Sequence, residues 1–251
     1  MIPDIHLVRA GLSYRHHIIF NDINLHIPAG STLALLGASG IGKTSLLRML
    51  AGLTTSAETI QGHIKMSNNI NIDTQIAYMA QQDLLLPWLN VLDNVMLPLK
   101  LCRHTSKDNR KGETFAENLL ERAGLASAKK LFPHQLSGGM RQRTALVRTL
   151  IQEKPVILMD EPFSALDTIT RYHLQNLALE MLRNKTIIFI THDPIEAIRL
   201  ADNIYLMEGS PATIKHIASP KSAAPRDIHD DINIKLHAEI FTRLASGEVI
   251  T

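Results

Sequence analysis

The segment Gly37-Ala-Ser-Gly-Ile-Gly-Lys-Thr44 constrains the fold of this chain more than any other stretch of its sequence. An apolar run, residues 32–36, precedes it, and a stretch with helical character, residues 45–50, follows it. A glycine-rich turn between a buried strand and a helix is typical of α/β architecture, where the turn lies at the carboxyl end of a parallel strand. The segment therefore predicts a strand, a tight turn and a helix in direct succession.

The spacing of the same segment matches the phosphate-binding pattern G-x-x-x-x-G-K-[ST]. Its glycines let the backbone turn tightly and direct N–H groups at phosphate oxygens, and the following helix presents its positive end to the same anion. Lys43 is expected to reach the β- and γ-phosphates of ATP, and the Thr44 hydroxyl to bind Mg²⁺. The predicted nucleotide-binding residues here are Gly37, Ala38, Ser39, Gly40, Ile41, Gly42, Lys43, Thr44 and Ser45.

Two later apolar runs, residues 156–159 and 187–190, are each followed by loop residues and a helix-like segment. Near-continuous apolar runs of this length are typical of parallel strands covered on both faces, so the sequence predicts a doubly wound α/β core. Residues 1–30 instead alternate apolar and polar side chains. This alternation predicts an N-terminal antiparallel β-subdomain, with a turn around His16 and His17.

Runs of the β type are missing between about residues 83 and 150, where helical spacing predicts a helical subdomain inserted in the α/β core. Together these parts form one domain over residues 1–217. Residues 218–251 begin with a linker rich in Pro, Ser and Ala and continue into an amphipathic helix. The apolar residues that recur at every fourth position of this helix are Ile232, Leu236, Ile240 and Leu244.

The charge and composition of the 251-residue chain argue against several classes of protein. Its net charge is +2, with acidic and basic residues mixed, and it lacks the clustered basic excess of a dedicated DNA-binding protein. Cys102 is the only cysteine, which rules out an intrachain disulfide. No stretch approaches about 18 consecutive apolar residues and no N-terminal signal pattern is visible, so we expect a soluble protein whose membrane role requires a partner.

Two adjacent acids, Asp160 and Glu161, end the apolar run at residues 156–159. A buried strand that ends in two carboxylates delivers both to the edge of the sheet. Asp160 suits the role of holding Mg²⁺ through its water shell, and Glu161 is placed to polarise an attacking water. Taken alone, the pair is equally consistent with solvated acids at a strand end, but the phosphate-binding segment favours the catalytic interpretation.

The segment Leu136-Ser-Gly-Gly-Met140 is similar to the LSGGQ signature of ABC ATPases, and the two acids follow it at the interval usual in that family. Ser137, Gly138 and Gly139 at the start of a helix form a second anion site on physical grounds alone. In the family, two domains pair head-to-tail, and each signature closes over the nucleotide of the other. Met140 departs from the family pattern, which has Gln, but it lies beyond the phosphate-binding residues, so we expect activity to survive.

The resemblance to ABC ATPases extends over about residues 5–215 and implies a P-loop NTPase core of the ABC type. Asp167 matches the loop that crosses the dimer interface, and His192 matches the histidine that contacts the γ-phosphate. Gln81 matches the glutamine that links the metal site to the helical subdomain. Tyr14 occupies the place of an aromatic residue that stacks on adenine, and a tyrosine of the core or surface is the alternative there.

The same resemblance implies an ATP-hydrolysing homodimer that binds ATP and Mg²⁺ and drives a separate integral membrane permease. A periplasmic or extracellular solute-binding protein is implied as an indirect partner, and no nucleic acid is. The chain would then lie peripherally, on the cytoplasmic face of the cell (inner) membrane. The C-terminal helix would either pack on its own core or add to the dimer contact.

The segment Leu85-Leu-Pro-Trp88 resembles a feature of importer subunits in the nitrate/sulfonate/taurine group, which includes relatives for thiamine-pyrimidine precursors. In that group the region contacts the coupling helix of the permease, whereas local core packing is the alternative for these residues. Three other functions stay open: a soluble assembly ATPase of the iron–sulfur scaffold type, an ATPase acting on nucleic acid, and an exporter. A single cassette with neither a coiled-coil insertion nor fused membrane helices favours the importer.

Overall fold

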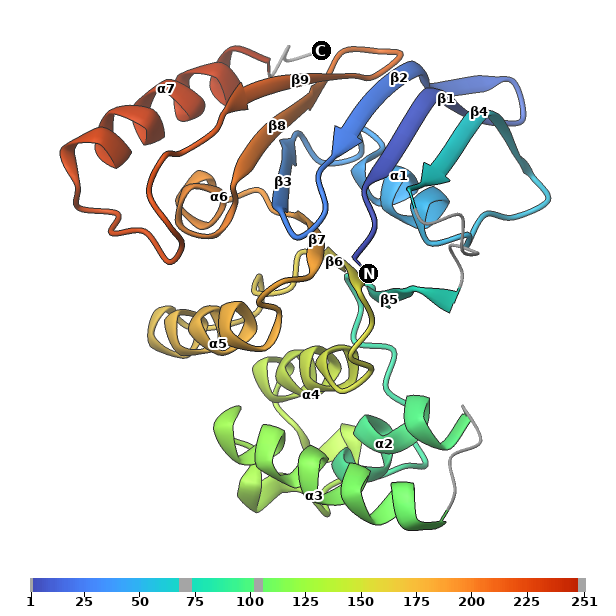
Figure 1. Ribbon diagram of the computed structural model, residues 1–251, viewed down its shortest axis with the longest axis vertical. Helices are drawn as coiled ribbons and strands as arrows, with labels where there is room; N and C mark the ends of the chain where they lie inside the picture. Colours follow the sequence, from blue (N-terminus) through green and yellow to red (C-terminus); the bar gives the residue numbers. More distant parts are fainter. Residues whose placement is uncertain (1, 68–73, 102–105, 248–251) are drawn as a thin grey trace. The chain divides into compact units, whose positions relative to one another are not determined.

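The computed structural model describes residues 2–67, 74–101 and 106–247, so Cys102 lies outside the described residues. The chain divides into two compact units, which Figure 1 traces from the N-terminus to the C-terminus. The first unit consists of Met1–Ile76, Pro155–Glu161 and Asn184–Thr251, and the second of Ala77–Lys154 and Pro162–Arg183. Each unit therefore contains segments that are far apart in the sequence.

A three-stranded antiparallel sheet forms the N-terminal part of the first unit. Its strands are β1 (Ile5–Tyr14), β2 (His17–Ile27) and β4 (Glu58–Met66), in the order β2-β1-β4. Alternating side chains of β1 and β2 are buried, which confirms the predicted antiparallel strands and the turn between them. β4 is not recognisable from the sequence, because most of its residues are exposed and show no apolar alternation.

The larger sheet has the strand order β5-β6-β7-β3-β8-β9, and all of these strands except β5, which continues into the second unit after Ile76, belong to the first unit. These strands are β3 (Thr32–Gly37), β5 (Ile76–Met79), β6 (Val156–Asp160), β7 (Thr186–Ile190), β8 (Asn203–Glu208) and β9 (Thr213–Ala218). β3 pairs in parallel with β7 and β8, β6 pairs in parallel with β7, and β8 pairs with β9 in antiparallel fashion. Every residue of β3, β6 and β7 is buried, which confirms the prediction of parallel strands covered on both faces.

The described part of the first unit also contains the α-helices α1 (Lys43–Leu50), α6 (Pro194–Leu200) and α7 (Asp231–Gly247). The amphipathic helix predicted near the C-terminus is α7, which packs against α6 and buries Ile240. Arg226 holds the segment before α7 in place, because its guanidinium donates hydrogen bonds to the carbonyl oxygens of Ile198 and Ala201 at 3.1 and 2.7 Å. The predicted linker therefore ends in a buried anchor.

The second unit is built around four α-helices: α2 (Val91–Leu101), α3 (Ser106–Arg122), α4 (Gly138–Leu150) and α5 (Thr168–Met181). Two short 3₁₀-helices, η2 (Ala126–Ala128) and η3 (Pro133–Gln135), precede α4. α2 contacts both α3 and α4 (Figure 1). Among its described residues, the stretch between 83 and 150 contains no strand, as the sequence predicts.

No described helix is both long enough and apolar enough to cross a membrane.

Candidate functional site

The loop between β3 and α1 lies so close to its neighbours that two of its glycines leave no room for a side chain. A Cβ atom at Gly37 would lie 2.5 Å from the Met207 carbonyl oxygen, and one at Gly42 would lie 2.6 Å from a methyl carbon of Ile19. Gly42 also has φ of 110°, a conformation that other residues rarely adopt. α1 begins at the next residue, so its free N–H groups open into this loop, as a phosphate site requires.

Lys43 is held inside the loop by backbone carbonyl groups. Its Nζ donates hydrogen bonds of 2.7 Å to the carbonyl oxygens of both Gly37 and Ala38, and the residue is 7% exposed. Burial lowers the pKa of Lys43, while the nearby carboxylates of Glu161 and Asp160 oppose that shift. The ammonium group is thus kept beside the positions where the loop N–H groups would place phosphate oxygens.

Asp160 ends β6 with a buried carboxylate that is only partly satisfied. The Thr44 hydroxyl forms a hydrogen bond with it, but Oδ2 has no hydrogen-bond partner among the described residues. Burial raises the pKa of Asp160, and the Thr44 hydrogen bond opposes that shift. An orphaned carboxylate oxygen beside a hydroxyl is the hard-oxygen environment that Mg²⁺ prefers, so the residues present fit this ion.

Glu161 and His192 follow neighbouring parallel strands, β6 and β7, and face each other. The His192 Nδ1 lies 3.7 Å from a carboxylate oxygen of Glu161, and the side chain of His192 is 65% exposed. Glu161 has φ of 48° and donates its N–H to the Ile190 carbonyl oxygen at 3.0 Å. A left-handed backbone costs a non-glycine residue about 1–3 kcal/mol, and such strain is typical of functional sites.

Tyr14 lines a pocket of about 550 Å³ that opens beside the phosphate-binding loop. The tyrosine is 44% exposed, and the Arg15 guanidinium carbon lies 5.5 Å from the centre of its ring. The residues lining this pocket are Tyr14, His17, Ile18, Ile19, Ala38, Ser39, Gly40, Ile41, Gly42, Ser45, Gly209 and Ser210. An exposed aromatic ring next to a phosphate loop is suitably placed for a planar base, although its role stays a prediction.

A second, smaller pocket of about 280 Å³ brings the C-terminal helix to the same loop. On one side are residues 37–39 of the loop, together with His192 and Pro194. On the other side are Phe241, Leu244 and Ala245 of α7. The sequence analysis did not connect this helix with the phosphate-binding loop.

The remaining predicted residues lie in the second unit. Ser137 caps α4, since its hydroxyl accepts a hydrogen bond from the Met140 N–H at 3.3 Å. Asp167 caps α5 by accepting the Thr170 N–H at 3.0 Å, and the bonding to Thr170 lowers the pKa of Asp167. Gln81 lies between β5 and α2. Because the Met140 cap bond uses the backbone, the change from the family glutamine leaves it intact.

Gln142 joins the two capped segments of the second unit. Its side chain accepts the Ala165 N–H at 2.8 Å and donates to the Ser164 hydroxyl at 3.2 Å, while the residue itself is 6% exposed. A Cβ atom at Gly139 would lie 3.3 Å from the Ala165 carbonyl oxygen, so the segments approach closely. Sequence reasoning missed Gln142, although a polar residue within the apolar face of a helix is a usable signal.

The structure thus divides the predicted site residues into two sets. The first unit brings together residues 37–45, Asp160, Glu161 and His192 at the carboxyl ends of parallel strands, with Tyr14 beside them. The second unit contains Gln81, Ser137, Gly138, Gly139 and Asp167.

Comparison with protein families and curated relatives gives consistent matches. The family model described as ABC transporter matches residues 20–164. An uncharacterised ABC transporter ATP-binding protein of Haemophilus influenzae is 41% identical over 87% of this chain and 89% of its own length. An aliphatic sulfonates import ATP-binding protein of Pseudomonas syringae pv. tomato is 36% identical over 95% of this chain and 97% of its own length.

Among solved structures, a dimeric bacterial ABC transporter cassette is 27% identical to this chain, with a TM-score of 0.75. A post-hydrolysis state of that cassette, bound to ADP and Pi, is 26% identical and also has a TM-score of 0.75. In both cases the similarity covers 87% of this chain and 100% of the cassette. The fold of the chain is therefore that of ABC ATPase cassettes.

Proposed function

Since the chain belongs to the ABC transporter ATP-binding family and is an ATPase, we propose that it powers an importer as a head-to-tail homodimer that drives a separate membrane permease. One observation carries the catalytic part of this proposal. Among the residues that the structure describes, the buried Oδ2 of Asp160 has no hydrogen-bond partner, although its carboxylate is hydrogen-bonded to Thr44 and adjoins Glu161 in the chain. A buried carboxylate oxygen of this kind needs a cation, or a water bound to a cation, as its partner. The Mg²⁺ that accompanies bound ATP would be such a cation.

The residues of the first unit divide the work of phosphoryl transfer among them. Lys43 exchanges its bonds to the loop carbonyls for bonds to the β- and γ-phosphates. Thr44 and Asp160 would hold Mg²⁺, and the resemblance to the family implies Gln81 as a further ligand; the ion would supply neutralisation of the charge that develops on the phosphates. Glu161 polarises the attacking water, and His192 contacts the γ-phosphate.

The second unit supplies its part of the site to the other chain. Ser137, Gly138 and Gly139 close over the nucleotide bound by the partner, and Asp167 approaches the partner's phosphate-binding loop. Closure excludes water and strengthens each interaction between a charge and a phosphate. After hydrolysis, the bridge between the chains is lost and the dimer reopens, which is a two-state change that can drive a permease.

Residues 84–88, which we call the docking segment, provide the surface for the permease. Leu84 is 60% exposed and Trp88 is 70% exposed, whereas Leu85 between them is 8% exposed. Leu85 therefore packs in the core, and the other two place apolar area on the surface. An exposed tryptophan and leucine on one segment are suited to burial against a partner.

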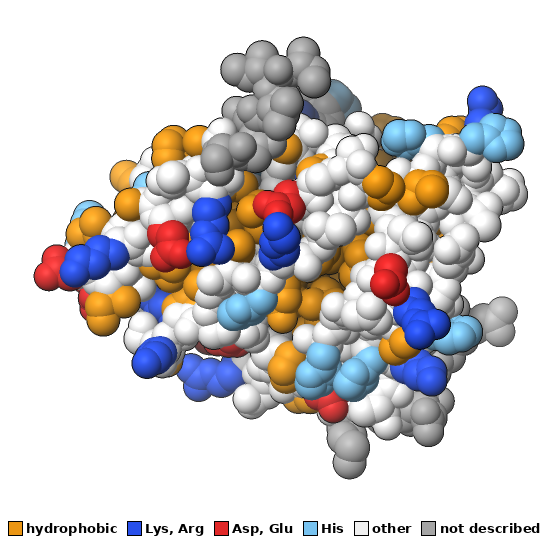
Figure 2. All heavy atoms as spheres, turned by 90° about the horizontal axis from the view of Figure 1, so that it is seen from above, with side chains coloured by type: hydrophobic (Ala, Val, Ile, Leu, Met, Phe, Trp, Pro, Cys, Tyr) orange, Lys and Arg blue, Asp and Glu red, His pale blue; other side chains and the backbone are white. Residues whose placement is uncertain are grey.

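The relatives named as aliphatic sulfonates import ATP-binding proteins favour the nitrate/sulfonate/taurine group for this importer. A solute-binding protein then delivers the solute to the permease, and this chain acts peripherally at the cytoplasmic face of the inner membrane. On the face drawn in Figure 2, basic and acidic side chains lie interspersed. Together with the net charge of only +2 for the whole chain, this mixture supports a protein that does not act on nucleic acid.

A capture experiment tests the importer proposal. Tagged Glu161→Gln is recovered from detergent-solubilised membranes with ATP and Mg²⁺, and co-purifying chains are identified by mass spectrometry. We expect a polytopic permease in stoichiometric amount, and the same preparation of Trp88→Ala should retain much less of it. Recovery of a soluble partner in place of a permease would instead favour an assembly ATPase of the iron–sulfur scaffold type.

A further inference from the structure

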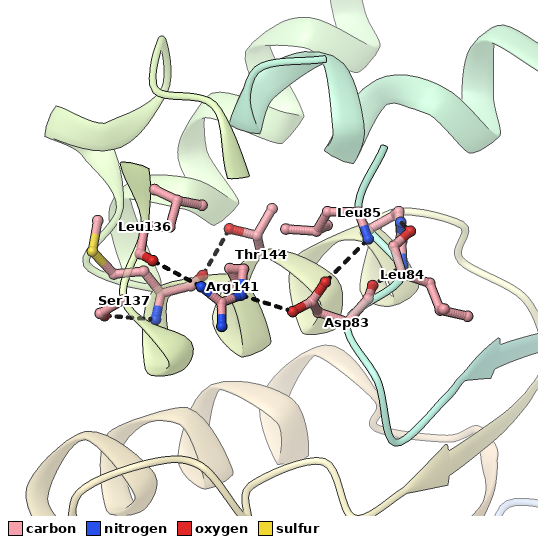
Figure 3. Close-up of polar contacts among 9 residues, drawn as sticks. Asp83, Leu84, Leu85, Leu136, Ser137, Arg141 and Thr144 are labelled. Carbon is pink, nitrogen blue, oxygen red and sulfur yellow. Dashed lines mark hydrogen bonds and ion pairs between the residues drawn. The ribbon is translucent and has the colours of Figure 1, made fainter. Parts of the chain in front are cut away.

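A single arginine of α4 joins the docking segment to the segment that begins that helix. The Arg141 Nε donates a hydrogen bond of 3.0 Å to the Asp83 carboxylate, and its Nη1 donates one of 2.9 Å to the Leu136 carbonyl oxygen (Figure 3). Asp83 immediately precedes the docking segment. Leu136 immediately precedes Ser137, the cap of α4, and begins residues 136–140, which we call the signature segment.

Two further contacts fix the start of the docking segment. Arg148, two turns along α4 from Arg141, donates hydrogen bonds to the carbonyl oxygens of Asp83 and Leu84 at 2.5 and 2.8 Å. The Asp83 carboxylate accepts the Leu85 N–H at 3.2 Å (Figure 3). Burial lowers the pKa of Arg148, and the charge of Asp83 opposes that shift. α4 therefore holds both the backbone and the carboxylate at this end of the docking segment.

Asn94 of α2 holds the middle of the docking segment, at Leu86. It is fully buried, and its side-chain oxygen accepts the Leu86 N–H at 2.8 Å. Its amide nitrogen donates to the carbonyl oxygens of Leu86, Leu89 and Asn90, at 3.2, 2.9 and 3.0 Å. A segment that is hydrogen-bonded to two helices is expected to move together with them. A displacement of Trp88 would then also displace α2 and α4.

We propose that Arg141, together with Asp83, is a positioning residue that couples the docking segment to the signature segment. The proposal rests on the function proposed above. A permease that displaces residues 84–88 then moves Ser137, which closes the partner's nucleotide. Because coupling between two sites is reciprocal, the proposal expects closure of the signature segment on a partner's ATP to displace the docking segment and so to change the surroundings of Trp88.

The choice of arginine matters for this coupling. Arg141 and Asp83 are partly exposed, with side-chain exposures of 38% and 32%, and an ion pair of this kind stabilises a fold only weakly. The planar guanidinium instead bonds two different segments at once, in directions that its rigid fork determines. Its role is to fix the geometry between the two segments more than to add stability.

Trp88 supplies the test, because it is the only tryptophan of the chain and is exposed. In the Glu161→Gln parent, ATP and Mg²⁺ should shift the Trp88 emission as the dimer forms, with dimerisation followed separately by size-exclusion chromatography. We expect Asp83→Asn and Arg141→Gln, each added to that parent, to lose most of this shift while still dimerising. Asp83→Asn keeps the size of the side chain, so it tests the proposal even if the arginine variant folds poorly.

Lys129→Gln is the matched control, since it removes another partly exposed ion pair of the same unit, to Glu117 at 2.7 Å, without touching the docking segment. It should shift the Trp88 emission as the parent does. An unaltered shift in both network variants would overturn the coupling role. So would a parent that dimerises with no change at Trp88, although the proposed function would stand. A parent that fails to dimerise with ATP would contradict the proposed function itself.

Discussion

At the scale of single residues, several groups of the site are in energetically unfavourable surroundings or conformations when no nucleotide is bound. Asp160 is 1% exposed and carries a carboxylate oxygen that has no hydrogen-bond partner in the described part of the chain, and Glu161 has a left-handed backbone. The ammonium group of Lys43 donates its hydrogen bonds to two backbone carbonyl oxygens. Nucleotide and Mg²⁺ relieve these conditions, so function and stability should respond in opposite directions to some substitutions.

Glu161→Gln should bind ATP and dimerise but hydrolyse it slowly. Loss of a general base costs about 10²–10⁴-fold in rate, and glutamine retains the size of the side chain and its ability to accept a hydrogen bond. Steady-state release of phosphate, compared with equilibrium binding of ATP, separates the two effects. Turnover near the wild-type rate would show that another group activates the water.

Lys43→Ala should lose most of its affinity for ATP, because the ammonium group provides charge-assisted hydrogen bonds to phosphate. Such bonds contribute about 1.5–3 kcal/mol each, which is roughly a tenfold to hundredfold change in the dissociation constant. Titration with ATP, followed by calorimetry, measures this change. Lys129→Ala, on the surface of the other unit, is the control and should bind as the wild type does; unchanged binding in Lys43→Ala would refute its assignment.

Asp160→Asn should stabilise the free protein while abolishing hydrolysis. Burial raises the folded-state pKa of Asp160 above its unfolded value, so the charged carboxylate opposes folding, and its cost grows as the pH rises through the ordinary range of an aspartate. Without nucleotide or Mg²⁺, the variant should therefore unfold at a higher temperature than the wild type at neutral pH. That difference should shrink toward about pH 4. Thermal unfolding measured over this pH range would reject the account if the wild type were the more stable at neutral pH.

At the scale of elements, some parts of the fold were predictable from sequence and others were not. β3, β6 and β7 are buried along their whole length, so each appears as an uninterrupted apolar run. β4 is mostly exposed and shows no such pattern. β5 has only four residues and, like several other strands, was not predicted from the sequence. The motif residues of both units can be predicted from their spacing in the sequence. The roles of Asn94, Gln142 and Arg226 cannot, because these side chains bond mainly to backbone groups that only the fold brings close.

Arg226→Ala should weaken the attachment of the C-terminal segment. The guanidinium is 1% exposed in its side chain, and its loss leaves the carbonyl oxygens of Ile198 and Ala201 without these bonds. Unsatisfied buried groups cost about 1–3 kcal/mol each, so unfolding should occur several degrees lower. Arg243→Ala removes an exposed ion pair to Glu239 and should cost less than about 0.5 kcal/mol. Equal effects of the two substitutions in denaturant titrations would contradict the anchoring role.

At the scale of the whole molecule, the two sets of site residues belong to different compact units of one chain. The first unit carries the phosphate-binding loop with Asp160, Glu161 and His192, and the second carries Gln81 together with Ser137 and its neighbours at the start of α4. The proposed mechanism requires a complete site to take one set from each of two chains. A chain with a damaged set should then be rescued by a chain whose other set is damaged.

Mixing two inactive variants tests this claim most directly. Lys43→Ala destroys the phosphate-binding set and Ser137→Arg the signature set, so homodimers of either variant contain no intact site. Their mixed dimer contains one intact site, built from Lys43 of one chain and Ser137 of the other. The account predicts that ATP hydrolysis, absent from each variant alone, appears when the two are mixed. A mixture as inactive as its separate components would contradict a site shared between two chains.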